Sequence, residues 1–426
     1  MKPPASLRRG WCPGVLRPMQ TGDGLLVRLR LRGARLDLDR AEAIADCAAR
    51  FGNGMIEISS RANLQLRGVD EARLPALQRR LDELGLLDAD AAGEGVRNIV
   101  ASPISDMDPS AIIDVSPVLA ALEARLADDA VLHRLPAKFG FLVDGGGVLP
   151  LGDVEADVRF EALRDEEAAR FAITLAGDDD TAAQCAARDV AEAAAALAGA
   201  FLQQAGLDAP GRMSGLVAHG GAAAVFVAAG LATVAPPSSL RRRAVRRDFL
   251  GVHPFGASAC VGAAPSLGRM TADEFRFLSQ EARRCSAVDI RLTPWRAFIV
   301  AGLGGGGAEE LAAALTHRGF ILDPADPRLC IIACSGAPAC ANAARPVQKD
   351  ALELVSAIGS GDGIVLHVSG CEKGCAHAKT APFTLIARQA GYDLVVNGKA
   401  TDKPWREALS VGAIASLVMQ ECGSAF

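Results

Sequence analysis

The sequence predicts an α+β fold built by internal duplication, with a cysteine-bearing part near its C-terminal end. Three observations lead to this prediction. Strand-like and helix-like apolar patterns alternate along the chain. A strand–helix–strand unit near the N-terminus recurs later, with Val27 matched by Val261, a shift of 234 positions. Two pairs of cysteines follow two further predicted strands in the last quarter of the chain.

The composition is that of a chain with more than one core. Of the 426 residues, 50% are hydrophobic and 4% are aromatic, and the net charge is −5. This charge gives no general attraction to nucleic acid or to an anionic membrane surface, and no apolar run is long enough to span a bilayer, so we expect neither partner. The start of the chain lacks a secretory signal, and the 11 cysteines are an odd, mostly scattered set. We therefore expect a reducing, cytoplasmic location.

The first unit has a clear order of elements. Residues 25–31 alternate between apolar residues and arginines, which predicts a half-buried strand with the arginines on one face. A helix is predicted over residues 39–51 with Asp39 as its N-cap. A second strand over 55–59 and a second helix over about 71–84 complete the unit.

The second copy repeats this order of strand, helix, strand and glycine. The matched pairs are Val27 and Val261, Arg35 and Arg269, Ala48 and Ala282, Ile56 and Ile290, Ile58 and Leu292, Ser59 and Thr293, and Gly68 and Gly302. A gapless match over a whole unit predicts a true internal duplication.

The segment between the copies is less regular. Residues 95–100 predict the start of a strand, residues 135–144 predict another, and the Ala-rich stretch 181–205 predicts a long helix. Residues 236–239 predict a linker. The basic run 241–247 that follows is either a solvated face or an edge that binds carboxylates.

The two cysteine pairs indicate a metal site. Cys334 and Cys340 have five residues between them, Cys371 and Cys375 have three, and residues 342–358 between the pairs predict a helix. Each pair follows a predicted strand, so two loops at one sheet edge offer two thiolates each. Each iron of a [4Fe–4S] cluster takes one thiolate from the protein, so we expect these four cysteines to bind such a cluster.

Two other interpretations of the cysteines stay open. Structural zinc sites use short hooks of two to four intervening residues, and a gap of five followed by a gap of three fits them poorly. Buried, inert cysteines are the other possibility. Cys330 lies four positions before Cys334 and is a weaker ligand candidate, and Cys12 has no partner pattern.

With the duplication and these cysteine spacings, essentially the whole chain resembles the sulfite/nitrite reductase superfamily. The matching pieces include residues 60–65, the Arg97-Asn98 strand, residues 135–139 and the cysteine loops. The resemblance implies a duplicated architecture of two ferredoxin-like half-domains plus two α/β cluster-type domains. In the family a siroheme lies beside the cluster, and the match gives Cys375 the bridge to its iron.

The expected division of the chain follows from this resemblance. It consists of a first half-domain with an N-terminal arm over 1–93, an α/β domain without cluster cysteines over 94–235, a second half-domain over 236–305 and an iron–sulfur α/β domain over 306–426.

The resemblance also implies the residues that hold the substrate and the tetrapyrrole. Residue by residue, these are Arg61, Arg97 and Lys138, with Arg269 and Arg296 as weaker candidates. The chain departs from the family where the reductases carry a second lysine, because Gly140 stands there. One donor for a small oxyanion is missing, and the space could admit something larger.

Several phrases resemble one branch of the superfamily, the precorrin-3B synthases. They are residues 11–14, 250–254, 292–296 and 370–377. The branch implies an O2-dependent monooxygenase that hydroxylates precorrin-3A, with formation of a ring lactone, to give precorrin-3B in aerobic cobalamin biosynthesis. A fold that cradles siroheme could hold a precorrin instead, because both carry a rim of carboxylates.

The cofactors and partners implied by the branch are a [4Fe–4S] cluster, a mononuclear non-haem iron, O2, a tetrapyrrole substrate and an external NAD(P)H-linked electron donor. His253, His367 and His377 lie near the matched phrases, but the sequence identifies no iron ligands. Two alternatives remain. One is an assimilatory sulfite or nitrite reductase with resident, heme-type siroheme, and the other is a ferredoxin-like electron carrier without catalytic activity.

Overall fold

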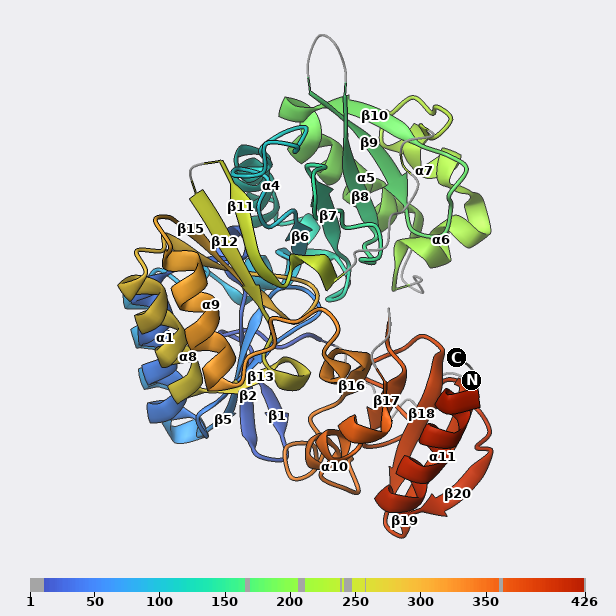
Figure 1. Cartoon of the computed structure of the whole chain (residues 1–426). Coiled ribbons are helices and arrows are strands. Elements are labelled where there is room, and N and C mark those ends of the chain that lie inside the picture. The colour runs from blue at the N-terminus through green and yellow to red at the C-terminus, as the bar shows by residue number, and fades with distance from the viewer. Residues whose placement is uncertain are drawn as a thin grey trace.

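The computed structural model describes residues 11–164, 169–205, 211–237, 240, 247–256, 258–359 and 363–424. Within these residues the chain forms four sheets of five strands each. Two sheets, backed by helices, form a central body, and two α/β parts lie beside it, one at the upper right and one at the lower right of Figure 1. The expected duplicated α+β architecture is confirmed.

The two sheets of the central body have the same order of strands. The first contains β1 (Met19–Thr21), β2 (Gly24–Leu29), β5 (Leu64–Val69), β4 (Met55–Ile58) and β13 (Arg269–Thr271), in that order. The second contains β11 (Gly251–Phe255), β12 (Ser258–Ala263), β15 (Phe298–Leu303), β14 (Asp289–Leu292) and β3 (Arg35–Asp37). Each sheet therefore ends in a strand of the other copy, since β13 pairs with β4 and β3 pairs with β14.

The duplication predicted from the sequence holds residue by residue. β2 begins at Gly24 and β12 at Ser258, and this difference, 258 − 24 = 234, is the shift predicted from the sequence. The backbone repeats as well, because the matched glycines Gly68 and Gly302 both have positive φ, at 61° and 77°. Glycine adopts this conformation without the steric cost that a Cβ imposes.

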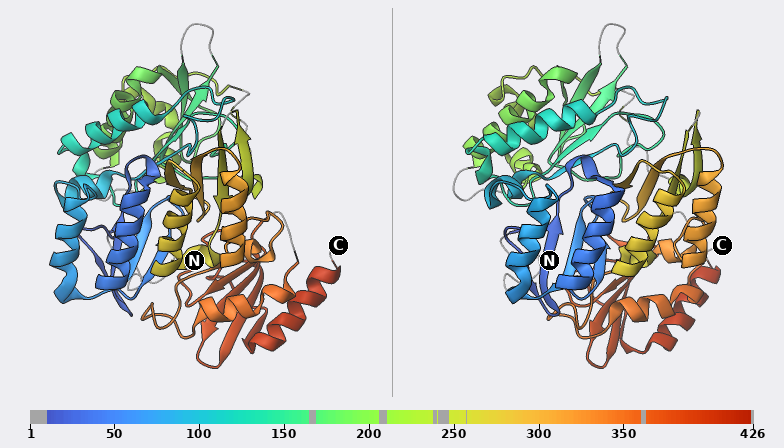
Figure 2. Two further views of the ribbon diagram at one scale, coloured as in Figure 1. Left: turned by 60° about the vertical axis from the view of Figure 1, so that its left-hand side comes forward. Right: turned by 90° about the vertical axis from the view of Figure 1, so that its left-hand side faces the viewer.

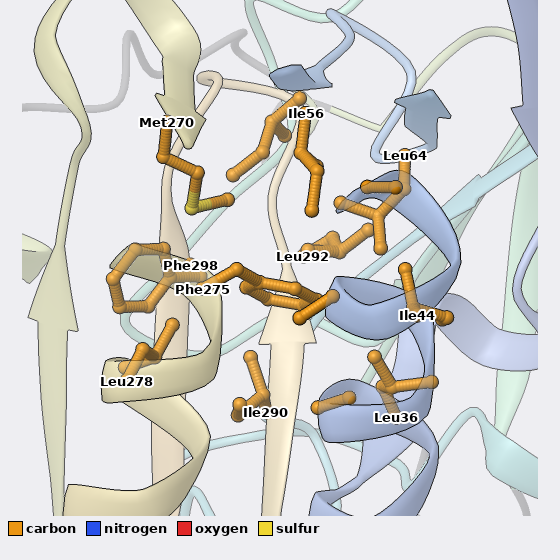
Figure 3. Packing of buried hydrophobic residues seen from close by; sticks show 14 of the residues in the cluster. Leu36, Ile44, Ile56, Leu64, Met270, Phe275, Leu278, Ile290, Leu292 and Phe298 are labelled. Carbon is orange, nitrogen blue, oxygen red and sulfur yellow. The ribbon is translucent and has the colours of Figure 1, made fainter. Parts of the chain in front are cut away.

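Four helices cover the outer face of the central body in a row. Figure 2 shows them in the order α2 (Leu74–Glu83), α1 (Leu38–Phe51), α8 (Ala272–Arg284) and α9 (Gly307–Arg318). Residues Ala41, Ile44, Ala48 and Phe51 give α1 an apolar stripe at helical spacing, which is buried. In the core, Ile44, Phe275, Ile290, Leu292 and Phe298 of both copies meet (Figure 3), so neither copy has a separate core.

The ends of these helices show where the sequence interpretation was wrong. Asp37, and not Asp39, caps α1, because its carboxylate accepts a hydrogen bond of 2.7 Å from the backbone N of Arg40. The matched residue Thr271 caps α8 through a capping box with Glu274. Asp39 instead lies in the first turn of the helix.

The two α/β parts share a second repeated topology. One sheet contains β6 (Ile99–Ala101), β7 (Phe141–Asp144), β8 (Val158–Leu163), β9 (Arg170–Leu175) and β10 (Ala183–Ala186). The other contains β16 (Ile331–Ala333), β17 (Leu366–Ser369), β18 (Ala381–Arg388), β19 (Gly391–Gly398) and β20 (Arg406–Leu409). In each sheet the first three strands are parallel and the last two antiparallel.

Helices cover these sheets. They are α3 (Ala91–Val96), α4 (Ser116–Asp128), α5 (Val190–Ala205), α6 (Met213–Gly220) and α7 (Ala222–Ala228) in the first part, and α10 (Val347–Glu353) and α11 (Val411–Ser424) in the second. None of the described helices is long and apolar enough to cross a membrane.

Three predicted elements are shorter than expected. The helix predicted over 181–205 begins at Val190, because β10 occupies the start of that stretch. The helix predicted over 342–358 contracts to α10, and the strand predicted over 135–144 begins at Phe141. Most of the basic run, residues 241–246, lies outside the described residues.

The division into four parts stays a proposal, with one change. We propose that the second half-domain extends through α9, because Leu311 and Leu315 of this helix are buried in the core that the two copies share. The matched helix of the first copy, α2, contributes Leu77 and Leu81 to the same core.

Candidate functional site

The four predicted cysteines lie on two loops at one sheet edge. Cys334 directly follows β16, and Gly370-Cys371 directly follow β17. These strands are parallel neighbours, so both loops leave the same edge of the sheet. The two loops are tied together, because the backbone N of Gly370 donates a hydrogen bond of 3.1 Å to Sγ of Cys334.

The four cysteines lie near one another, because Cys334, Cys340 and Cys371 all act on the pKa of Cys375. Although Cys375 is exposed at the surface, partial loss of hydration among its neighbours, together with the nearby Cys334, Cys371 and Cys340, raises its pKa to about 11. Burial also raises the pKa of Cys334. Metal binding must therefore displace protons from these thiols, which is the usual coupling of a thiolate site to pH.

Glycines let the two cysteine loops pack closely against neighbouring residues. A Cβ added at Gly370 would lie 2.6 Å from Cβ of Ala343 and 3.3 Å from Sγ of Cys334. Gly336 and Gly374 have φ of 67° and 61°, which turns the backbone sharply at both cysteine pairs. Four soft ligands on two converging loops fit a [4Fe–4S] cluster.

A row of polar side chains runs from the cysteine loop across the first sheet. Oγ of Ser335 donates to Oε1 of Glu57 at 3.2 Å, and Oε2 of Glu57 accepts from Nε2 of Gln65 at 3.0 Å. Oε1 of Gln65 in turn accepts from Nη2 of Arg28 at 2.7 Å. Arg269 from the other copy forms an ion pair of 3.1 Å with Glu57. The row connects the cysteine loop to a group of arginines.

The arginines at the far end of this row gather around Cys12. Burial lowers the pKa of Arg28 to about 10, against the effect of the nearby Cys12 thiol and with the help of Arg30 and Arg61. Burial also lowers the pKa of Arg61, whose Nη2 donates 3.0 Å to the backbone O of Lys138. Three guanidinium groups in one place favour an anionic ligand.

Several buried N–H groups in this region lack a hydrogen-bond partner among the described residues. They are Nε1 of Trp11, Nη2 of Arg30 and Nη1 of Arg61, together with Nε of Arg269, which is only ion-paired with Glu57. Both ring nitrogens of His367, beneath the second cysteine loop, also lack a partner among the described residues. The Arg30 side chain is only 2% exposed. Leaving a buried donor unpaired costs about 1–3 kcal/mol, so such groups mark surfaces that a ligand completes. Arg30 and Arg61 point to a ligand rich in acceptors.

The predicted site residues occupy different settings. Arg61 and the exposed Lys138 meet at the loop before β7. Arg97 is buried, and its Nε and Nη2 bond the two carboxylate oxygens of Asp88 at 3.2 and 2.7 Å. Glu123 lies 3.7 Å from its Nη1. The charge of Arg97 is therefore balanced within the protein, whereas that of Arg61 has no carboxylate at bonding distance among the described ion pairs.

Arg296, a weaker candidate, lies beside the cysteine loops. It occupies the turn between β14 and β15 with φ of 58°, as the matched Ala62 does in the first copy with φ of 52°. Burial lowers its pKa, while nearby Glu57 and Cys334 oppose the shift. Its Nη2 reaches the backbone O of Ala376 at 3.4 Å. Arg296 thus ties the second half-domain to the loop of Cys375.

The mononuclear iron implied by the resemblance finds no ligand set here. Among the described residues, no group of three or more His, Cys, Asp or Glu side chains is placed to hold a single metal ion, and this includes the four cysteines, whose proposed ligand is the larger [4Fe–4S] cluster. His367 and His377 are neighbours, with ring centroids 5.8 Å apart, and burial lowers the pKa of His367 to about 4. The two rings alone do not make the usual set of histidines and carboxylate.

Sequence reasoning missed Arg28, Arg30 and Cys12 as site residues. The alternation in residues 25–31 did place arginines on one face of β2, but it could not say what that face meets. The missing information is the pairing of β2 with β5, which sets Arg28 opposite Gln65.

The matched face of the second sheet is different. Gly262 replaces Arg28 and Ile299 replaces Gln65 at the shift of 234. A cavity of about 640 Å³ lies here, lined by Ile104, Ser110, Gly147, Val148, Leu149, Pro150, Asp248, Phe249, His253, Pro254, Phe255, Cys260 and Ile299. Among the described residues, the row of polar residues is therefore confined to the first sheet.

Comparison with known proteins shows which family the chain belongs to. The nitrite/sulfite reductase ferredoxin-like half domain matches residues 17–84, and the nitrite and sulphite reductase 4Fe-4S domain matches residues 92–298. A precorrin-3B synthase of Sinorhizobium sp is 33% identical over 94% of this chain and 85% of its own length. The chain belongs to the precorrin-3B synthase branch of the nitrite/sulfite reductase superfamily.

More distant members of the superfamily also match. A ferredoxin–nitrite reductase of Synechococcus elongatus is 23% identical over 92% of this chain and 83% of its own length. The solved Mycobacterium tuberculosis NirA protein has a TM-score of 0.76 at 20% identity, over 94% of this chain and 80% of that one, and thus shares the fold. The matched 4Fe-4S domain supports an iron–sulfur cluster, although the four cysteines lie beyond residue 298.

Proposed function

We propose that this chain is an O2-dependent monooxygenase that hydroxylates precorrin-3A, with ring lactone formation, to give precorrin-3B in aerobic cobalamin biosynthesis. The observation that carries this proposal is the 33% identity to a precorrin-3B synthase over 94% of the chain. The reaction places one oxygen atom of O2 in the product and reduces the other to water with two electrons and two protons. We propose an NAD(P)H-linked donor for these electrons and a cytoplasmic setting.

Gly140 provides no cationic side chain for a small oxyanion such as sulfite or nitrite. Its backbone N donates to Oδ2 of the fully buried Asp157 at 2.9 Å, and Asp157 N donates back to its O at 2.8 Å. A Cβ at this position would lie 3.3 Å from the backbone O of Asn98. The fold thus holds a residue without a side chain where the reductases carry their second lysine.

Substrate binding is assigned to the arginines around Cys12. We propose that Arg61 and Lys138 contact the carboxylate rim of the tetrapyrrole, together with Arg28 and Arg30. Arg97 is not proposed to contact the substrate, because its guanidinium group is already bonded to Asp88. Its proposed role is to hold the surrounding part of the site in place. Carboxylates are the acceptors that unpaired guanidinium N–H groups bind best.

Electron supply is assigned to the cysteine loops. Cys334, Cys340, Cys371 and Cys375 would hold a [4Fe–4S] cluster, which supplies single electrons when it is bound. The cysteine loop and the arginines lie on the same face of one sheet, because hydrogen bonds connect them through Ser335, Glu57 and Gln65. No residues are assigned to a mononuclear iron.

Turnover with isotopic oxygen tests the proposal. Purified protein with its cluster is mixed with precorrin-3A, a reductant and ¹⁸O2, and the product is analysed by mass spectrometry. We expect one ¹⁸O atom in a product that carries the lactone. A protein that leaves precorrin-3A unchanged but reduces sulfite or nitrite with the same reductant would be a siroheme-dependent reductase instead.

A further inference from the structure

His367 is a buried side chain with no partner to explain it. It lies on β17, four residues before Cys371, and it is 0% exposed. Neither Nδ1 nor Nε2 has a hydrogen-bond partner within the described part of the chain. Burying an imidazole without a partner is costly, and native structures rarely leave such a group unpaired.

The surroundings of His367 place it beneath the loop of the second cysteine pair. A Cβ added at Gly374, the residue before Cys375, would lie 3.7 Å from Cε1 of His367. The ring of His377, two residues after Cys375, is 5.8 Å away between centroids. The positive charge of Arg296, which also acts on the Cys334 thiol, lies close to both rings. The loop of the second cysteine pair thus lies over this buried ring.

The residue beside His367 on the neighbouring strand is also polar and buried, but it has a hydrogen-bond partner. Thr384 on β18 pairs in register with His367 and is also 0% exposed. Its hydroxyl donates to the backbone O of Gly398 at 2.9 Å. Two buried polar residues sit side by side, and only the one under the cysteine loop lacks a partner.

We propose that His367 is a positioning residue for the cluster, whose ring N–H donates a hydrogen bond to a sulfur of the bound cluster or of its Cys375 ligand. A hydrogen bond to sulfur stabilises the more negative, reduced cluster and so raises its reduction potential. This inference rests on cluster ligation by the four cysteines. It does not depend on which substrate is oxidised or reduced.

Redox titration of the cluster-loaded protein, followed by electron paramagnetic resonance, tests this role. We expect His367→Phe to lower the potential, so that the oxidised-to-reduced ratio at the wild-type midpoint rises at least about threefold. His367→Gln restores a side-chain N–H and should return the ratio toward wild type. Thr384→Val, the control with the satisfied neighbour, should leave the ratio unchanged.

Two results would overturn the inference. One is a His367→Phe protein with the wild-type potential, and the other is an equal shift in Thr384→Val. If His367→Phe cannot hold a cluster, the wild-type holoprotein labelled with ¹⁵N-histidine gives the answer by pulsed resonance. An imidazole nitrogen coupled to the reduced cluster, and still coupled in His377→Phe, supports the role, and its absence refutes it. A failure of precorrin turnover would not affect the interpretation of the cluster potential or of the nitrogen coupling.

Discussion

Arg61 and Arg97 lie in the same region but are expected to have different roles, one in binding the ligand and the other in stabilising the fold. Arg97 is held by Asp88 and Glu123, whereas Arg61 keeps a buried nitrogen without a partner. We predict that Arg97→Ala lowers the free energy of unfolding by about 3–5 kcal/mol, because buried carboxylates lose their counter-charge. Arg61→Ala should cost far less stability but weaken tetrapyrrole binding at least about tenfold.

Chemical denaturation and a binding titration with a uroporphyrinoid separate these effects. Arg188→Ala provides the control, because its side chain is 87% exposed and should affect neither quantity. Unchanged tetrapyrrole affinity in Arg61→Ala would remove this residue from the proposed site.

The cysteines give a second contrast at the same scale. Cys371 lies close enough to Cys334 to act on its pKa, whereas Cys330 is fully buried and accepts a hydrogen bond from Nη1 of Arg247 at 3.4 Å. We predict that Cys371→Ser abolishes the visible absorbance of the cluster and that Cys330→Ser retains it. Loss of absorbance in Cys330→Ser alone would mean that the ligand set was assigned wrongly.

At the scale of elements, matched glycines within strands β5 and β15 lead to a matched prediction. Gly68 and Gly302 both have positive φ, and an added Cβ would lie 2.5 Å from the Asn53 side chain and 2.4 Å from the Val288 side chain, respectively. We expect alanine at either position to destabilise the protein by at least about 1–2 kcal/mol. Alanine at Gly199, within α5 and with open space around it, should stabilise by about 0.5–1 kcal/mol.

Thermal denaturation of the three single variants is sufficient for this comparison. Equal stability of Gly68→Ala and wild type would show that this position of β5 tolerates a side chain. The prediction for Gly68 and Gly302 depends on the repeated backbone and not on any ligand. All variants can therefore be compared in the same cluster-loading state.

Elements also show what sequence patterns can and cannot supply. The repeat, the cysteine loops and most strands follow from local periodicity and spacing. The exchange of β3 and β13 does not, because it pairs segments more than 200 residues apart (Arg269 with Glu57, for example) whose patterns fit either sheet. The helix predicted over 181–205 failed at its start, where alanines entered β10 through pairing with β9.

The site was only partly predictable for the same reason. The four cysteines were proposed from their spacing, and Arg61 and Lys138 from the resemblance, and these assignments stay predictions. The row of Ser335, Glu57 and Gln65 needs the register of β4 against β5 and the docking of a loop 278 residues away. Neither can be read from a single sequence.

The whole molecule is a duplicated frame used asymmetrically. Both copies present a sheet to an α/β part, but one face carries arginines and meets the cysteine loops while the other is mainly apolar. This asymmetry leaves one place where a cluster and a carboxylate-rich ring can lie together. The central claim is that a tetrapyrrole enters this place as a substrate.

An anaerobic absorption spectrum of freshly purified protein, followed by acid–acetone extraction of its pigment, tests that claim most directly. We expect the broad absorbance of an iron–sulfur cluster and no extractable macrocycle, because the site awaits its tetrapyrrole. An intense band in the red region together with extractable siroheme would contradict this account, since the macrocycle would then be a resident cofactor.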